Sequence, residues 1–207
     1  MTDAGGGRPF DVVLCDVDNV IRFYDPSRLT ALERAAGLAE GTTMKVAFAP
    51  ETDLPLMLGR ITPQEWVHSI VAGLAGLVPE PVAYELGNAL ADAPFHADET
   101  VVALLRRARE HVLLVLLSNA SVTLEADLAS LGLSGLADDI VSSARVGLAK
   151  PDPRIYRLAA ERAGAPLDRC LFVDDTLENV TAAAALGLQT VHFRAPADLE
   201  RALAPLF

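Results

Sequence analysis

The sequence of 207 residues is poor in lysine, cysteine and tryptophan. It contains two lysines, Lys45 and Lys150, two cysteines, Cys15 and Cys170, and a single tryptophan, Trp66. Both cysteines lie within apolar segments, so we expect buried free thiols in a reducing compartment rather than a disulfide framework. Because lysine is so rare, a lysine that occurs within a motif is easy to single out.

The sequence also lacks an excess of positive charge and any long apolar run. Its formal net charge of −11 would repel nucleic acid phosphates and anionic membranes, so we expect neither as a partner. No segment approaches the roughly 18 apolar residues of a membrane span, and the start "MTDAGGGRPF" lacks a signal-peptide pattern. We therefore expect a cytoplasmic protein with an irregular first seven or eight residues.

Apolar segments of strand length alternate with helical patterns over most of the chain. This alternation is typical of a parallel sheet with helices on both faces, and it predicts the α/β class with a Rossmann-like three-layer core. The expected strands are residues 10–16, 111–118, 139–143, 170–174 and 190–193. The expected helices are residues 98–109, 122–131, 153–164, 177–186 and 197–204.

One stretch after the first strand interrupts this alternation. From about Tyr24 to Ala93 the sequence shows amphipathic helical patterns and no buried strand. Thr62 and Glu65 are three residues apart, which is the spacing of a helix N-terminal capping box. We expect Trp66 to pack inside this lobe. The predicted organisation is an α/β core formed by residues 1–22 and 94–207, with a small all-helical domain formed by residues 23–93.

Polar side chains follow four of the predicted elements at the same edge of the sheet. In an open parallel sheet, ligands bind beyond the carboxyl ends of the strands. The side chains expected at this edge are Asp16 and Asp18, Ser118 and Asn119, Lys150, and Asp174 and Asp175. A second acidic pair, Asp138 and Asp139, precedes its strand and is therefore expected at the opposite edge.

Four carboxylates in one crevice would raise one another's pKa values unless positive charge lies among them. Lys150 alone leaves an excess of negative charge. A divalent cation with oxygen ligands, most naturally Mg²⁺, resolves this excess and leaves room for a phosphate oxygen. The sequence therefore predicts a magnesium site at this edge, among the carboxylates of Asp16, Asp18, Asp174 and Asp175.

The ordered set of Asp16, Asp18, Ser118, Lys150 and Asp174–Asp175 resembles the haloacid dehalogenase superfamily of phosphohydrolases. The phrases "VGLAKPDPRIY" and "CLFVDDTLENVTAAAALG" are similar to the subgroup with a helical cap inserted after the first motif. This resemblance extends from Phe10 to Phe207. It implies a magnesium-dependent phosphatase that acts on a small phosphorylated metabolite. The sequence leaves the oligomeric state open between a monomer and a homodimer.

The resemblance also implies a role for each residue of the motifs. Asp16 would be the nucleophile that forms an aspartyl-phosphate, and Asp18 would move protons while its main-chain carbonyl binds the metal. Ser118 and Asn119 would bind the phosphoryl group, and Lys150 would neutralise its charge. Asp175 would be the principal acidic metal ligand, with Asp174 coordinating directly or through water.

Several alternatives to a phosphatase stay open at this stage. The superfamily also includes phosphomutases and dehalogenases, and a non-catalytic relative could bind a phosphorylated ligand without turnover. Asp18 favours phosphate chemistry, because the dehalogenases lack a carboxylate at that position. Asn19 replaces a usual glycine, and asparagine tolerates the left-handed backbone that the turn requires. The candidates for substrate contact around the helical lobe are Arg22, Tyr24, Lys45 and Arg60.

Overall fold

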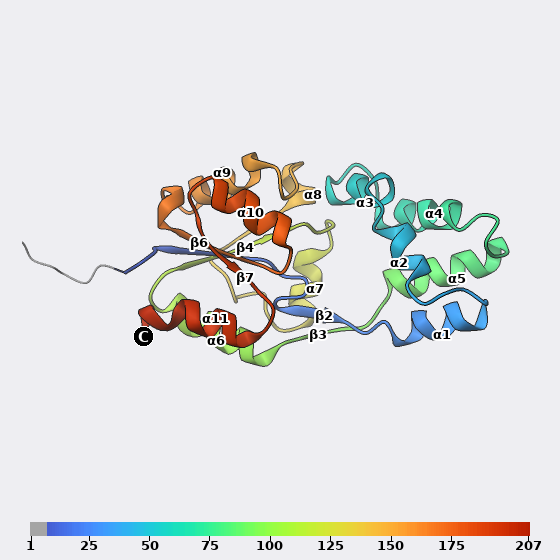
Figure 1. Ribbon diagram of the computed structural model, residues 1–207, viewed down its shortest axis with the longest axis horizontal. Helices are drawn as coiled ribbons and strands as arrows, with labels where there is room; N and C mark the ends of the chain where they lie inside the picture. Colours follow the sequence, from blue (N-terminus) through green and yellow to red (C-terminus); the bar gives the residue numbers. More distant parts are fainter. Residues whose placement is uncertain (1–7) are drawn as a thin grey trace, which may run out of the picture.

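The computed structural model describes residues 8–207, so most of the predicted irregular N-terminal segment lies outside the described residues. A parallel sheet forms the centre of the molecule, with the strand order β5-β4-β1-β6-β7 (Figure 1). Its strands are β1 (Val12–Cys15), β4 (Leu113–Ser118), β5 (Asp139–Ser142), β6 (Cys170–Asp174) and β7 (Gln189–His192). These strands confirm the predicted α/β class.

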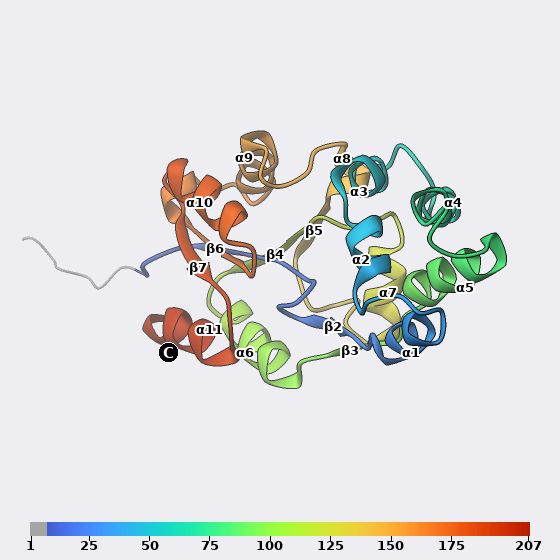
Figure 2. The same ribbon diagram turned by 45° about the vertical axis from the view of Figure 1, so that its right-hand side comes forward.

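Side chains of the sheet alternate between two apolar layers, as the two-residue period of a strand requires. Val13 and Cys15 pack on one face against α6 (Glu99–Arg109), α7 (Leu124–Ser130) and α11 (Pro196–Leu203). Val12 and Leu14 pack on the other face against α9 (Pro153–Arg162) and α10 (Leu177–Ala185). Figure 2 shows these helices above and below the sheet, which is the predicted three-layer arrangement. Cys15 and Cys170 are buried and free, as expected.

The stretch after β1 folds into a helical lobe with an apolar core of its own. Its helices are α1 (Ser27–Ala35), α2 (Thr42–Ala47), α3 (Pro50–Met57), α4 (Pro63–Gly73) and α5 (Glu80–Ala91). Trp66 lies in this core and donates a hydrogen bond from Nε1 to the carbonyl of Ala47 at 3.3 Å. Thr62 begins α4 with both hydrogen bonds of the predicted capping box.

A two-stranded antiparallel ribbon joins the lobe to the core. It pairs β2 (Arg22–Tyr24) with β3 (Phe95–Ala97), and neither strand is predicted by the sequence pattern. The lobe extends to one side of the sheet in both views (Figures 1 and 2). The predicted boundary between residues 22 and 23 falls inside β2.

The lobe also approaches the core near the edge strand β5. Gly59, which follows α3, lies against Ala144 of the short helix α8 (Ser143–Val146). A Cβ on Gly59 would meet the main-chain oxygen of Ala144 at 2.3 Å, and Gly59 has a φ of 67°. Both facts require glycine at this position.

Candidate active site

Three strand ends bring the predicted residues together at one edge of the sheet. Asp16 directly follows β1, Ser118 ends β4 and Asp174 ends β6. The main-chain N–H of Asp16 donates to Val173 at 2.9 Å, which keeps Asp16 beside the end of β6. The second acidic pair lies at the opposite edge as predicted, because Asp139 is the first residue of β5.

Lys150 lies at the centre of this edge. Its Nζ is 2.9 Å from Oδ1 of Asp16 and 2.6 Å from Oδ2 of Asp174, and it donates to the carbonyl of Leu117 at 3.0 Å. The side chain is 1% exposed. Burial lowers the pKa of Lys150, but the charges of Asp16 and Asp174 outweigh burial and raise it overall. Lys150 therefore remains a fixed cation between two carboxylates.

Asp16 and Asp174 differ in how their oxygens are used. Asp174 is fully buried, and its two oxygens accept from Lys150 Nζ, the amide Nδ2 of Asn179 and the main-chain N–H of Thr176. Asp16 accepts from Lys150 and, at 2.7 Å, from the main-chain N–H of Val17. Burial raises the pKa of Asp16, while Lys150 opposes this shift. Asp174 is thus held more completely than Asp16.

A group of three carboxylates at this edge could hold a metal ion. One oxygen each from Asp16, Asp174 and Asp175 lies within 4.8 Å of the other two. Asp175 is only partly buried, and its pKa is raised first by burial and then by the charge of Asp16. Carboxylate oxygens are the ligands that hard divalent cations prefer, so the donor set fits the predicted cation. The side chain of Asp18 does not belong to this group.

Ser118 and Asn119 behave differently although they are neighbours. The buried hydroxyl of Ser118 has no hydrogen-bond partner within residues 8–207. The side-chain amide of Asn119 instead donates to the carbonyl of Lys150 at 2.8 Å and accepts from the N–H of Lys150 at 2.7 Å. Asn119 therefore fixes the loop that carries Lys150, through one donated and one accepted hydrogen bond of its side-chain amide.

Asp18 points to a partner that the sequence does not predict. Its two oxygens accept from Nε and Nη2 of Arg22 at 2.7 and 3.1 Å. Burial raises the pKa of Asp18, and the hydrogen bonds from Arg22 oppose that shift. Asn19, which lies between Asp18 and Arg22 in the sequence, adopts a φ of 59°. This value confirms the predicted left-handed turn without glycine.

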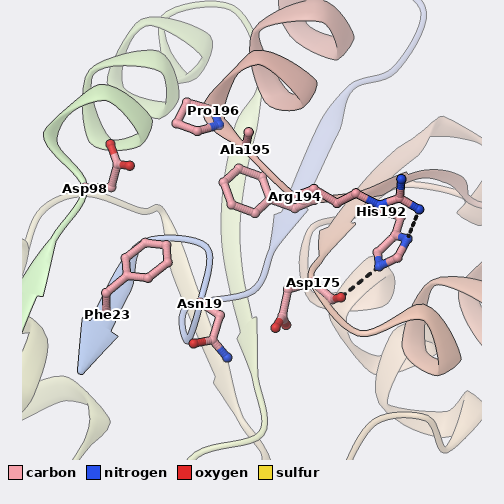
Figure 3. Close-up of a pocket in the computed structure, with 9 residues that line it drawn as sticks. Asn19, Phe23, Asp98, Asp175, His192, Arg194, Ala195 and Pro196 are labelled. Carbon is pink, nitrogen blue, oxygen red and sulfur yellow. Dashed lines mark hydrogen bonds between the residues drawn. The ribbon is translucent and has the colours of Figure 1, made fainter. Parts of the chain in front are cut away.

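A cavity of about 510 Å³ adjoins the acidic group on the side of β7. Figure 3 shows Asn19 and Asp175 on its wall, with Phe23 and Arg194 nearby. His192 donates from Nε2 to the carbonyl of Asp175 at 2.9 Å, because a carbonyl can only accept. Its Nδ1 then faces Nη2 of Arg194 at 3.4 Å. The hydrogen bond from His192 thus stabilises the main chain at Asp175.

The comparison with protein families agrees with this geometry. A model described as "Hydrolase: haloacid dehalogenase-like hydrolase" matches residues 10–187. The chain belongs to the haloacid dehalogenase-like hydrolase family. Membership makes it a hydrolase and confirms the predicted resemblance to this family.

Curated relatives match this haloacid dehalogenase-like hydrolase over short stretches. A drimenol cyclase of Aspergillus calidoustus is 38% identical over 72 residues, which are 35% of this chain and 14% of the relative. A phosphatase of Mycobacterium tuberculosis is 42% identical over 57 residues, which are 28% of this chain and 26% of the relative. The match thus covers no more than about a quarter of the length of either relative.

Solved structures of the family share the fold over nearly the whole chain. A haloacid dehalogenase family enzyme of Bacteroides thetaiotaomicron, crystallised with magnesium and inorganic phosphate, is 22% identical with a TM-score of 0.69, covering 90% of this chain and 95% of that chain. An L-2-haloacid dehalogenase of Xanthobacter autotrophicus is 20% identical with a TM-score of 0.64, covering 94% and 82%. At these identities, the likeness shows the fold alone.

Three polar residues of this hydrolase join the site without a sequence motif that predicts them. Asn179 lies on α10, five residues after Asp174, and donates to both of its oxygens. Arg22 contacts Asp18, and Asp127 of α7 contacts Arg22. The four-residue spacing of Asp18 and Arg22 is the one signal available in the sequence, and it lies outside any helix.

No helix within residues 8–207 combines the length and the apolar character that crossing a membrane requires.

Proposed function

We propose that this hydrolase is a magnesium-dependent phosphatase that acts on a small phosphorylated metabolite through a phosphorylated Asp16. The observation that carries the proposal is Lys150, a buried cation whose Nζ lies 2.9 Å from Oδ1 of Asp16. The hydroxyl of Ser118 at the end of the adjacent strand adds a donor that no group within residues 8–207 accepts. A cation, a free donor and a nucleophilic carboxylate suit a transferring phosphoryl group.

Asp16 would attack phosphorus, so that a bond forms between its oxygen and phosphorus while the bond to the leaving oxygen breaks. Asp18 would donate a proton to the leaving alcohol and then accept a proton from the water that attacks phospho-Asp16. This second attack releases inorganic phosphate and regenerates the carboxylate of Asp16. Lys150 would neutralise charge on Asp16 and on the phosphoryl oxygens throughout.

Phosphate binding would combine side-chain and main-chain groups at the end of β4. The hydroxyl of Ser118 would donate to a phosphoryl oxygen. Asn119 would contribute its main-chain N–H, because its side-chain amide is engaged by the main chain of Lys150. Because the side-chain amide of Asn119 holds the main chain of Lys150, it also fixes the position from which the Lys150 side chain extends.

Magnesium would be held by carboxylate oxygens of Asp16 and Asp175 and by the main-chain carbonyl of Asp18. Asp174 would act through water, because its oxygens are occupied by Lys150, Asn179 and a main-chain N–H. When bound, the ion would supply positive charge that stabilises the transferring phosphoryl group.

The helical lobe, residues 23–93, would serve as a cap domain on the core formed by residues 1–22 and 94–207. A cap excludes water from the reacting group and contacts the leaving group. Tyr24, Lys45 and Arg60 are exposed and remain candidates for that contact. Arg22 is buried at 3% exposure and lacks the access that such a contact requires.

The proposal is tested by hydrolysis of para-nitrophenyl phosphate. We expect turnover with magnesium, loss of turnover with excess EDTA, and a loss on the order of 10³-fold or more in Asp16→Asn. In Asp18→Asn we expect a burst of one equivalent of para-nitrophenolate per site, because this leaving group departs without a proton while breakdown of phospho-Asp16 still needs a base.

The matched control is Glu178→Gln, which removes an exposed carboxylate from the first turn of α10 close to Asp175 and should retain full activity. Full activity of Asp16→Asn, or turnover that EDTA does not affect, would contradict the proposal. Halide release from a 2-haloacid, with no release of phosphate from any phosphate ester, would instead identify a dehalogenase.

A further inference from the structure

Arg22 is a buried arginine whose guanidinium contacts four side chains. Nε and Nη2 form a bidentate pair with Asp18, and Nη1 donates to Oδ2 of Asp127 at 2.8 Å. The central carbon of the guanidinium lies 5.0 Å from the ring centroid of Tyr24 and 5.3 Å from that of Phe95. Figure 1 places β2, which Arg22 begins, beside the loop that follows β1.

These contacts leave little of the guanidinium free to move. A planar guanidinium fixes a carboxylate in one orientation when two of its N–H groups donate in parallel. Asp127, the second anchor, also accepts from the hydroxyl of Thr123 at 3.1 Å. Arg22 is therefore held from α7 and from both strands of the β2–β3 ribbon.

The orientation of the Asp18 carboxylate depends on its hydrogen bonds with Arg22. Asp18 lies in the turn after β1, and its side chain is 29% exposed. The side-chain hydrogen bonds that hold its carboxylate come from Arg22. Without Arg22, the carboxylate of Asp18 would be free to adopt other rotamers.

We propose that Arg22 is the positioning residue that orients the carboxylate of Asp18 for proton transfer, with Asp127 as the anchor that orients Arg22. This inference rests on the proposed function, in which Asp18 protonates the leaving group. It replaces the expectation from the sequence that Arg22 contacts the substrate. Proton transfer requires the carboxylate within hydrogen-bond reach of the leaving oxygen, so a loss of orientation lowers its rate.

The test compares para-nitrophenyl phosphate with phenyl phosphate, which has nearly the same shape but a more basic leaving group. In Arg22→Lys, which keeps the charge but loses the bidentate pair, we expect kcat/KM for phenyl phosphate to fall on the order of 10- to 100-fold. We expect kcat/KM for para-nitrophenyl phosphate to change less than about threefold, because that leaving group needs no proton. The kcat of Arg22→Lys for para-nitrophenyl phosphate should nevertheless fall, because a misoriented Asp18 slows the hydrolysis of phospho-Asp16.

Asp127→Asn provides a second, milder variant, because Asp127 is partly exposed and its loss leaves Arg22 paired with Asp18. It should show the same dependence on the leaving group with a smaller amplitude. Arg34→Lys is the matched control, since Arg34 also pairs with a carboxylate but is 73% exposed in the lobe. This control should leave both substrates unaffected.

A double-mutant cycle separates positioning from other roles. In an Asp18→Asn background, Arg22→Lys should cause no further loss of kcat/KM for phenyl phosphate. An equal loss for both substrates, or a further loss in the Asp18→Asn background, would overturn the inference while the phosphatase proposal stands. Absence of phosphatase activity in the wild-type protein would instead defeat the proposed function.

Discussion

The sheet edge and the outer surface of the helical lobe differ in how firmly they hold their charged side chains. At the sheet edge, Lys150 and Asp174 are buried and bonded to one another, so each side chain has one position. In the lobe, apolar contacts around Trp66 and Ile70 hold the helices together, while Lys45 and Arg60 lie exposed at the surface. The side chains that we propose to react are therefore fixed by the fold, whereas Lys45 and Arg60, the proposed substrate contacts, are free to move.

The largest expected effect in this comparison comes from removing Lys150. Lys150→Met leaves Asp16 and Asp174 as buried carboxylates without their shared cation, and breaking a buried pair typically costs about 3–5 kcal/mol. We expect the free energy of unfolding, measured by urea denaturation at neutral pH, to fall by about that amount.

The only other lysine of the sequence provides the control. Lys45→Met removes an exposed ammonium from α2 and should change the free energy of unfolding by less than about 0.5 kcal/mol. Equal unfolding midpoints for the two lysine variants would remove the proposed difference between the sheet edge and the lobe.

A smaller effect, on activity alone, is expected for Ser118→Ala. The hydroxyl of Ser118 is buried without a partner in the described part of the chain, so its removal breaks no hydrogen bond and should leave the free energy of unfolding unchanged or slightly higher. The phosphoryl group would lose a donor, which should lower kcat/KM for para-nitrophenyl phosphate by about 10- to 100-fold. A variant that is destabilised but fully active would show that the hydroxyl serves the fold instead.

The smallest expected effect concerns Asp53 of the lobe. One of its oxygens is buried without a hydrogen-bond partner among the described residues, and burial raises the pKa of Asp53 to about 6. A carboxyl whose pKa is higher in the folded than in the unfolded protein destabilises the fold increasingly as the pH rises between the two pKa values. The destabilisation by the ionised carboxylate of Asp53 is thus absent below about pH 4 and complete above about pH 6 to 7.

Asp53→Asn removes this charge with little change of shape. After allowance for its partial exposure, we expect the variant to be more stable than the wild-type protein by about 1 kcal/mol at pH 8 and equally stable at pH 4. Thermal unfolding at the two pH values measures this difference. A gain at pH 4 as large as that at pH 8 would exclude the charge as its cause.

The sequence predicts the core well because its signals are local. The apolar segment 170–174 coincides with β6, and the placement of polar residues at strand ends locates Asp16, Ser118, Lys150 and Asp174 at one edge. Apolar periodicity and strand direction are sufficient for both inferences, because each depends only on neighbouring residues.

The parts that the sequence does not predict depend on contacts between distant residues. Strands β2 and β3 have three residues each, and residues 25–94 lie between them, so neither carries a local pattern. Arg22 is an expected substrate contact in the sequence but a buried partner of Asp18 in the structure. Its second partner, Asp127, is 105 residues away, and only the folded chain brings the two together.

The contact between Gly59 and Ala144 limits how the lobe can be placed relative to the edge strand β5. The ribbon attaches the lobe near β1, and main-chain atoms meet at Gly59 on the far side, beside β5. The distance between the two bodies at this point is set by the thickness of two backbones rather than by any side-chain rotamer. The separation between the lobe and the edge of the core at this point is therefore a property of the backbone, and substitutions of exposed lobe side chains such as Lys45 and Arg60 leave it unchanged.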